Sequence, residues 1–313
     1  MRINRNREIS RRQLIQGGVA AGVALATHGA WAADARALPQ VLKTIPSTGE
    51  KLPAVGVGTN AYGNEDRAEL KRVLTGLPEL GGKVVDTARQ YQGSEDMIGG
   101  LLAEIGNRDR IFLATKTPMQ GSVAAGPAVL DVSFQQLKVS RIDLLQIHNM
   151  NGMDQLMPHM KEYKAAGKIR YVGMTTSTDG QYDPIMAAMK SHKPDFVQVD
   201  YSIGNRGAAD SVLKLAQELG TGVLINMPFG GRGRSFFPRL ANVAVPDFAK
   251  EFDAGTWAQF MLKYIISHPA VTATIPGTTT YAYLEDNQMG GRGRLPDAAM
   301  RKRMEDFWDK LPS

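Results

Sequence analysis

The sequence predicts an α/β fold of the (β/α)8 TIM-barrel type, preceded by an N-terminal β-hairpin. Apolar runs of strand length alternate with amphipathic segments of helical length through most of the chain. There are eight such runs, which is the number of strands in this barrel. Most are continuously apolar, as expected of parallel strands that are covered on both faces. The pattern lies within residues 33–313, so we expect these residues to form one domain.

The predicted elements follow one another in a regular order. Residues 41–60 are expected to form the hairpin and lead into the first strand, with residues 47–50 as the turn. The predicted strands are 54–58, 83–86, 111–115, 142–147, 169–174, 196–200, 222–226 and 271–275. The helices predicted between them include 65–80, 94–105, 127–138, 153–166 and 208–219.

A doubly wound open sheet is the alternative fold. It would require a Gly-x-Gly-x-x-Gly turn directly after the first strand, because that turn brings the backbone close to a bound pyrophosphate. The sequence has only a fragment of this pattern, Gly-Val-Gly-Thr at 56–59. The barrel is therefore the preferred interpretation.

The first 32 residues have the features of an export signal. Arg11 and Arg12 precede a mild apolar run over residues 17–26, and Ala30-Trp31-Ala32 is the small-x-small pattern that signal peptidase cleaves. The segment resembles a twin-arginine translocation (Tat) signal. We therefore expect the Tat machinery as a partner during export of the folded chain, and a periplasmic destination. An uncleaved amphipathic helix is the alternative.

Composition excludes several classes of function. The formal net charge is +6, but five arginines and one glutamate in residues 1–32 supply +4 of it, so no nucleic-acid surface is expected. The absence of cysteine excludes disulfides and Cys-ligated metal centres. The five histidines are scattered, so no metal site is expected either. No stretch after residue 32 is apolar enough for a stable membrane span, and the basic run 301–303 is expected to be a solvated helix face.

Ionisable side chains stand at the carboxyl ends of three consecutive predicted strands, where catalytic groups gather in such barrels. Asp86 ends the second strand, Lys116 follows the third and His148 follows the fourth. Tyr91 comes five residues after Asp86, in the next loop. We expect the four side chains to meet at one rim of the barrel.

These four groups suit proton transfer to a carbonyl oxygen. A phenol is a weak acid at neutral pH, so Tyr91 needs a cationic neighbour, and Lys116 would supply that charge. Asp86 would keep the lysine protonated, and His148 would hold the substrate oxygen as a neutral donor. A purely structural ion pair is the alternative for Asp86 and Lys116 taken alone.

With these residues the chain resembles the aldo-keto reductases, which are nicotinamide-dependent enzymes on a (β/α)8 barrel. The shared motifs include Asp-Thr-Ala-Arg-Gln-Tyr at 86–91, Arg-Ile-Asp-Leu-Leu-Gln-Ile-His at 141–148 and Ile-Pro-Gly-Thr at 275–278. The resemblance implies that a small aldehyde or ketone is reduced to an alcohol, with Tyr91 as general acid. It further implies that the hydride comes from the reduced nicotinamide and that the hairpin closes the barrel end opposite the active site.

The resemblance also implies where the cofactor binds, with NADP expected rather than NAD. Gln198 would contact the nicotinamide carboxamide, the Gly-rich loop 229–234 would hold the pyrophosphate, and Asn287 would lie at the adenosine end. The residues expected to bind the cofactor are Gly58, Thr59, Thr175, Thr176, Gln198, Met227, Phe229, Gly230, Arg232, Gly277, Thr278 and Asn287. The substrate pocket is expected between loops around Tyr62 and Asn149 and the C-terminal segment.

Two features depart from the family pattern. The aromatic residue that usually stacks on the nicotinamide is replaced by Asn226, and no basic side chain for a 2′-phosphate is evident near Gly277 and Tyr283. The periplasm also lacks an obvious supply of reduced nicotinamide. A cofactor-binding sensor or auxiliary subunit with little turnover is therefore the alternative function.

Overall fold

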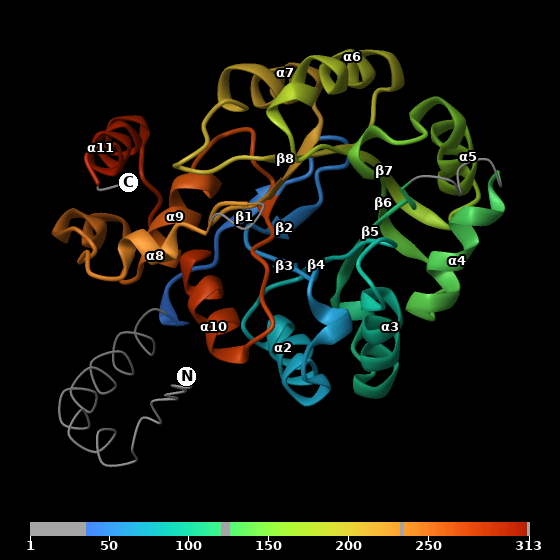
Figure 1. The fold of residues 1–313 in the computed structure, drawn as a ribbon, viewed down its shortest axis with the longest axis horizontal. Coiled ribbons are helices and arrows are strands. Elements are labelled where there is room, and N and C mark those ends of the chain that lie inside the picture. The colour runs from blue at the N-terminus through green and yellow to red at the C-terminus, as the bar shows by residue number, and fades with distance from the viewer. Residues whose placement is uncertain (1–35, 120–125, 232–234, 312–313) are drawn as a thin grey trace, which may run out of the picture.

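The computed structural model describes residues 36–119, 126–231 and 235–311, and in these residues it has a barrel of eight parallel strands ringed by helices (Figure 1). Each strand pairs with the next along the chain. Parallel bridges of Val55 with Thr274 and of Gly58 with Gly277 join the first and last strands and close the ring. The strands are β3 (Val57–Gly58), β4 (Val84–Asp86), β5 (Phe112–Lys116), β6 (Ile142–Ile147), β7 (Ile169–Thr175), β8 (Phe196–Asp200), β9 (Gly222–Asn226) and β10 (Ala273–Thr274). The predicted (β/α)8 TIM barrel is confirmed.

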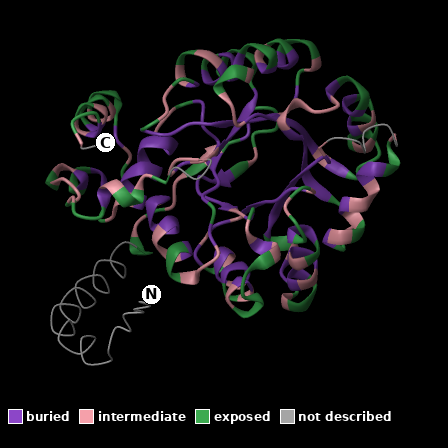
Figure 2. Cartoon of the chain, in the orientation of Figure 1, coloured by how far each residue is buried: buried purple, intermediate pink, exposed green. Residues whose placement is uncertain are grey.

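Helices cover the outside of the barrel and turn their buried sides toward it (Figure 2). Side-chain caps fix where some of them begin: the Asp66 carboxylate accepts the N–H of Ala68 at 2.9 Å, at the start of α2. The segment predicted as one helix over 208–219 begins with a π-helical turn, Ala209–Leu213. The α-helices of the described residues are α2 (Arg67–Glu79), α3 (Ser94–Ile105), α4 (Ala128–Leu137), α5 (Met153–Ala165), α6 (Tyr182–His192), α7 (Lys214–Leu219), α8 (Phe237–Leu240), α9 (Trp257–Ile266), α10 (Tyr281–Gly290) and α11 (Ala298–Trp308).

Side chains alternate along each strand between the barrel interior and the helix layer. Part of the interior is filled by the rings of Phe112, Tyr171 and Phe196, whose centroids lie 5.4 to 6.1 Å apart. The carboxyl ends of the strands differ, because Asp86 and Lys116 are the last residues of β4 and β5 and both are buried. Charged groups therefore occupy the interior at the end of the barrel where the strands finish.

The predicted hairpin is present and packs into the barrel. Its antiparallel strands are β1 (Leu42–Thr44) and β2 (Lys51–Pro53). Ile45 and Leu52 are fully buried in one cluster with interior residues such as Phe112 and Tyr171. Glu50, in the turn, accepts a hydrogen bond of 2.7 Å from the Tyr171 hydroxyl. The hairpin thus closes the barrel end opposite the charged groups.

The predicted export signal over residues 1–32 and its cleavage site lie outside the described residues. In the part of the chain that is described, no helix has both the length and the apolar character that crossing a membrane requires. The order of the elements shows that the hairpin and all eight barrel strands come after residue 35.

The expectation of a solvated basic face over 301–303 is wrong for Arg301. Its guanidinium donates to Ser267 Oγ at 2.7 Å and to the Tyr201 hydroxyl at 2.6 Å. The same group lies 4.1 Å from the centre of the Tyr264 ring. Arg301 therefore ties α11 to α9 and to Tyr201, which directly follows β8.

We predict that Leu52→Ala lowers the free energy of unfolding by about 2–5 kcal/mol, because it leaves a cavity among the interior residues of the barrel. Leu42→Ala is the matched control, since Leu42 lies in the same hairpin but is 50% exposed. The control should change the unfolding free energy by less than about 0.5 kcal/mol. Urea unfolding followed by tryptophan fluorescence measures both, and equal effects would show that the hairpin does not fill the barrel.

Candidate active site

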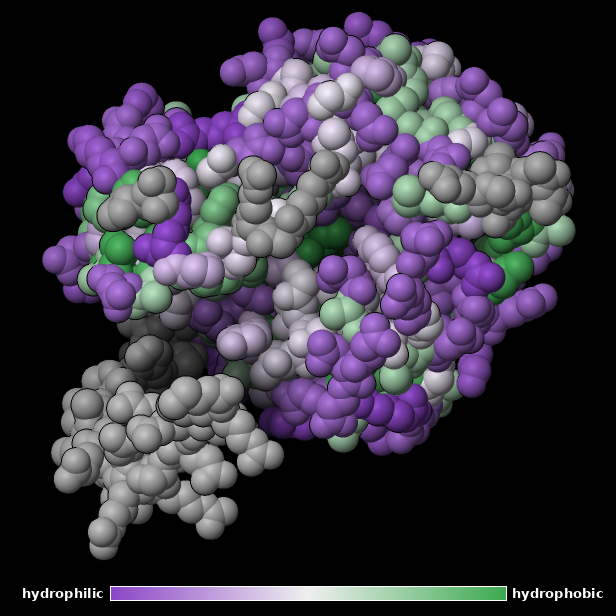
Figure 3. Space-filling model, viewed as in Figure 1, coloured by the Kyte–Doolittle hydropathy of each residue, from purple (hydrophilic) through white to green (hydrophobic). Residues whose placement is uncertain are grey.

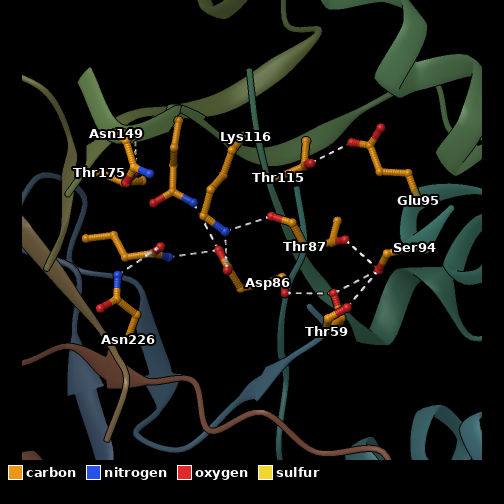
Figure 4. A network of polar contacts seen from close by, with 12 residues as sticks. Thr59, Asp86, Thr87, Ser94, Glu95, Thr115, Lys116, Asn149, Thr175 and Asn226 are labelled. Carbon is orange, nitrogen blue, oxygen red and sulfur yellow. Dashed lines mark hydrogen bonds and ion pairs between the residues drawn. The ribbon is translucent and has the colours of Figure 1, made fainter. Parts of the chain in front are cut away.

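A buried ion pair lies at the carboxyl ends of β4 and β5. The Lys116 ammonium donates to Asp86 Oδ2 and, at 2.8 Å, to the carbonyl oxygen of Thr87 (Figure 4). Burial alone would lower the pKa of Lys116, but the charge of Asp86 and the Tyr91 hydroxyl outweigh it and hold the pKa above its ordinary value. Lys116 is therefore a cation at neutral pH, although its side chain is only 1% exposed.

Tyr91 lies beside this cation. The Lys116 nitrogen is 5.0 Å from the centre of the Tyr91 ring. Backbone hydrogen bonds hold the loop, because the Tyr91 N–H donates to Ala88 at 3.0 Å and the Ser94 N–H donates to the Tyr91 carbonyl at 2.6 Å. The ring meets that of His148 edge to face, with centroids 6.0 Å apart. Three of the predicted residues thus converge here.

His148 follows β6 directly and completes the group. Its backbone N–H donates to Thr117 Oγ1 at 3.1 Å, and the chain then turns sharply at Asn149, which has a left-handed backbone with φ of 47°. Burial, and then the nearby Lys116 ammonium, lower the pKa of His148 to about 3. The imidazole is therefore neutral at neutral pH and can act as a hydrogen-bond donor without carrying charge.

Amide side chains lie beside the ion pair. Gln198 Nε2 donates to Asp86 Oδ1 at 2.9 Å, and Gln146 Nε2 donates to the same oxygen at 3.0 Å. Asn226 Nδ2 donates to the carbonyl oxygen of Thr176 at 3.2 Å and reaches Gln198 Oε1 at 3.5 Å. Asn226 therefore belongs to a polar network at the position where the family usually places an aromatic ring.

A chain of hydroxyl groups, from Thr59, Thr87 and Ser94, lies next to the backbone of Asp86 (Figure 4). Thr59 Oγ1 donates to the Asp86 carbonyl oxygen at 3.0 Å. Ser94 Oγ donates to the Thr59 carbonyl at 3.0 Å and lies 3.0 Å from Thr87 Oγ1. These contacts connect α3 to the ends of β3 and β4, so the helix that follows Tyr91 is fixed relative to the ion pair.

A cavity of about 690 Å³ opens over these groups, and the face shown in Figure 3 is hollowed near the middle of the barrel. Its volume is typical of a small-molecule or cofactor site. All four predicted catalytic residues line it, namely Asp86, Tyr91, Lys116 and His148. Most of the residues predicted to bind the cofactor line it as well, namely Gly58, Thr59, Thr175, Gln198, Met227, Phe229, Gly230 and Gly277.

Three residues predicted to bind the cofactor do not line the cavity. Thr176 is fully buried and its hydroxyl donates to Gln181 Oε1 at 2.7 Å. The Thr278 hydroxyl donates to the Pro276 carbonyl and accepts from Asn287 Nδ2, both at 3.0 Å. These polar groups are satisfied inside the protein, where they support the cavity wall. Arg232 lies outside the described residues.

The cavity offers groups that fit a nicotinamide dinucleotide. Gln198 and Asn226 place amides at the floor, next to the four ionisable residues. A Cβ added at Gly277 would meet only Asn60 Oδ1, at 3.4 Å, so the backbone there is bare and open to close approach. Gly230 has φ of 89°, a left-handed conformation that favours glycine and exposes backbone at the rim.

Several residues of this site were not predicted from the sequence. Phe237, which is 41% exposed, lines the cavity with its ring centre 5.2 Å from that of Phe229. Gln146 was missed because it lies within an apolar strand. The pattern that could have revealed it is its position two residues before His148, which places both side chains on the same, inward side of the strand. Both loops expected at the substrate pocket reach the cavity, through Asn60 and Asn149, whereas the Tyr62 ring itself is fully buried in the core. Among the described residues, no group of His, Asp and Glu could hold a metal ion.

Comparison with known proteins shows similarity in sequence and in fold. The chain is 26% identical over 304 residues to the aldo-keto reductase yakc of Schizosaccharomyces pombe, whose name specifies NADP(+), over 82% of this chain and 88% of that one. Its fold is similar to that of AKR11C1 from Bacillus halodurans in its holo form (TM-score 0.71, 21% identity, 85% of this chain and 96% of that chain). It is also similar to that of a Klebsiella pneumoniae aldo/keto reductase in complex with NADP and acetate (TM-score 0.69, 21% identity, 87% and 96% covered).

The sequence profile described as the aldo/keto reductase family matches residues 54–302. These residues include every strand of the barrel and the whole set of ionisable groups at its rim. The protein therefore belongs to the aldo/keto reductase family and is an oxidoreductase.

Proposed function

We propose that the protein reduces a small aldehyde or ketone to an alcohol with NADPH, using Tyr91 as the general acid. The observation that carries the proposal is the buried cation of Lys116 beside Tyr91, at the floor of a cavity of about 690 Å³. A bound reduced nicotinamide would supply the hydride. Tyr91 supplies the proton that the resulting alkoxide needs.

The remaining groups prepare this proton transfer. Lys116 stabilises the phenolate that Tyr91 becomes, and Asp86 keeps Lys116 in place and charged. His148 is neutral, so it orients the carbonyl oxygen by donating a hydrogen bond and does not compete as an acid. Gln198 lines the cavity next to these groups, where it would hold the carboxamide of the cofactor.

NADP rather than NAD is proposed as the cofactor. The support comes from relatives, since yakc carries NADP(+) in its name and the Klebsiella structure is a complex with NADP. The Gly-rich loop after β9 would hold the pyrophosphate, with Phe229 and Gly230 at the cavity rim and Arg232 beyond them. Titration of nicotinamide fluorescence with NADPH and with NADH compares the two affinities directly.

The proposed place of action is the periplasm, after export through the Tat machinery. The support is the order of the twin arginine, the apolar run and Ala30-Trp31-Ala32 in residues 1–32. The barrel strands and the hairpin all come later in the chain, so removing this segment would leave them intact.

We predict that Tyr91→Phe lowers kcat for carbonyl reduction by about 10²- to 10⁴-fold, because the hydroxyl that donates the proton is lost. NADPH affinity should stay within a factor of about three, since the ring and the cation remain. The loss of reduced-nicotinamide absorbance over a panel of aldehydes and ketones measures the rate.

The matched control for this variant is Tyr283→Phe, which removes the same atom from a residue that is 67% exposed and outside the cavity lining. Its rate should equal that of the natural chain. Unchanged turnover in Tyr91→Phe would overturn the mechanism. Tight NADPH binding by the natural chain with no carbonyl consumed would instead favour the cofactor-binding sensor, a function that the missing stacking aromatic at Asn226 keeps open.

The pH dependence of kcat should lack a step near the ordinary pKa of histidine, about 6.5. The pKa of His148 is lowered to about 3, so the imidazole stays neutral and the rate stays level as the pH falls through that region. The rate should decline at alkaline pH, as Lys116, whose pKa is held above its ordinary value, loses its proton. His148→Asn keeps a donor that does not titrate. If kcat of the natural chain fell at acidic pH and kcat of His148→Asn did not, His148 would be gaining a proton in that range, which would contradict its being neutral there.

Replacing both arginines of the signal, Arg11→Lys with Arg12→Lys, should retain the protein in the cytoplasm. The Tat machinery recognises the arginine pair itself, so keeping the charge does not restore export. Fractionation of expressing cells measures the periplasmic share. Arg5→Lys with Arg7→Lys is the control, because it makes the same change in the same segment, and equal export of both variants would contradict the proposal.

A further inference from the structure

Both oxygens of the buried Asp86 carboxylate are occupied. Oδ2 accepts from the Lys116 ammonium, and Oδ1 accepts from Gln146 Nε2 at 3.0 Å and from Gln198 Nε2 at 2.9 Å. The exposed fractions of these four residues are 0 to 2%. With water kept away, the direction in which Asp86 points is decided by these protein donors.

The two amides differ in what else they can do. Gln198 lines the cavity and can contact a bound molecule. Gln146 does not line it, and within the described residues its Oε1 is buried without a hydrogen-bond partner. A buried unpaired acceptor is unfavourable, and an apolar side chain would avoid it. The hydrogen bond from Nε2 to Asp86 is therefore the favourable polar interaction that the Gln146 side chain makes, and a leucine could not make it.

The neighbouring strand makes room for Gln146. Gly173 of β7 is its partner in the parallel register. A Cβ added to Gly173 would lie 2.9 Å from Gln146 Cγ, 3.1 Å from Leu144 Cδ1 and 3.2 Å from the Phe196 carbonyl oxygen. Any larger residue there would push Gln146 away from the position that it holds. Glycine is thus required at 173 by close approach.

We propose that Gln146, seated against Gly173, is a positioning residue that holds Asp86 so that its Oδ2 stays on Lys116 and Lys116 stays beside Tyr91. The inference rests on the proposed reductase function and deepens it. Gln146 touches neither the cavity nor the reacting atoms. It acts through Asp86, and its loss lets the carboxylate turn about its side-chain bonds.

Movement of the Asp86 carboxylate would change the pKa of Lys116, and through it the pH dependence of kcat. The groups that face its ammonium are Asp86 from β4, Tyr91 from the following loop and His148 after β6. Asp86 and Tyr91 hold the pKa of Lys116 above its ordinary value against burial. A carboxylate that turns away supports the cation less, so the pKa of Lys116 falls and the alkaline decline in kcat moves to lower pH.

Gln146→Leu tests the inference in the full-length protein. We expect kcat to fall about 10- to 100-fold, as for the loss of one hydrogen bond to a buried charge, with the alkaline limb moved to lower pH. NADPH affinity, measured by fluorescence titration, should stay within a factor of about three, because Gln198 is untouched. The thermal midpoint should not fall, since the unpaired Oε1 is removed too.

Gln259→Leu is the matched control. Gln259 is a glutamine of similar burial that donates to a carboxylate, Asp286 Oδ1 at 2.7 Å, and it does not line the cavity. This variant should leave kcat and its pH dependence unchanged. A shift of the alkaline limb in both variants would show a general effect of losing buried amides and would overturn the inference.

Two further variants probe the same contact by other means. Gly173→Ala should reproduce the loss in kcat and the shifted limb while Gln146 itself is kept, because the added methyl displaces it. In Gln146→Glu the introduced carboxyl can donate to Asp86 only while it is protonated. The kcat of this variant should therefore approach that of the natural chain at low pH and should fall as the introduced carboxyl ionises. Over the same pH range the kcat of the natural chain should not change.

The outcomes separate this inference from the function on which it rests. Unchanged kcat and pH dependence in Gln146→Leu would overturn the positioning role, and so would a loss of folding with no pH signature in Gly173→Ala or Gln146→Glu. If Tyr91→Phe retains full activity, the proposed function itself fails. A shifted limb in the Gln146 and Gly173 variants, together with an inactive Tyr91→Phe, supports both.

Discussion

The arrangement of this site depends on keeping two opposite charges, Asp86 and Lys116, out of water. Burying an ion pair is unfavourable unless the remaining lone pairs and protons also find partners. Here the carboxylate is completed by two amides and the ammonium by the Thr87 carbonyl oxygen. This requirement explains why the inward-facing layer at the strand ends is polar, whereas aromatic rings fill another part of the same barrel.

The two ends of the barrel have separate tasks. One end is filled by the hairpin and by packed rings, and it contributes stability. The other carries a cation, a neutral imidazole and a phenol over a cavity, so its polar groups are available to a ligand. Because burial, and then the Lys116 charge, lower the pKa of His148, a single positive charge faces Tyr91 at neutral pH. The field at that point is then set by one cation rather than two.

The sequence was sufficient for the barrel and for the four rim residues, because buried parallel strands form continuous apolar runs and their ends are visible as the first ionisable residue. The runs over 142–147, 196–200 and 222–226 agree with β6, β8 and β9. Side-chain direction could not be predicted. Gln146 lies inside an apolar run, and the Tyr62 side chain points into the core. The polar groups of Thr176, Thr278 and Asn287 form hydrogen bonds to neighbouring residues and do not face the cavity. The Gln146 contact joins segments 60 residues apart, whereas the Thr176 and Thr278 hydroxyls bond to residues nearby in the chain; an apolar pattern specifies neither kind of contact.

The bridge between Gly58 and Gly277 has a consequence for how the protein is made. Both residues line the cavity, and they come from the two ends of the barrel sequence. Contacts between such distant segments form late, because the entropy of closing so long a loop must be overcome first. A chain still being synthesised therefore has no complete cavity until Gly277 has emerged from the ribosome, and a ligand that spans this seam can bind only after all eight barrel strands have been made.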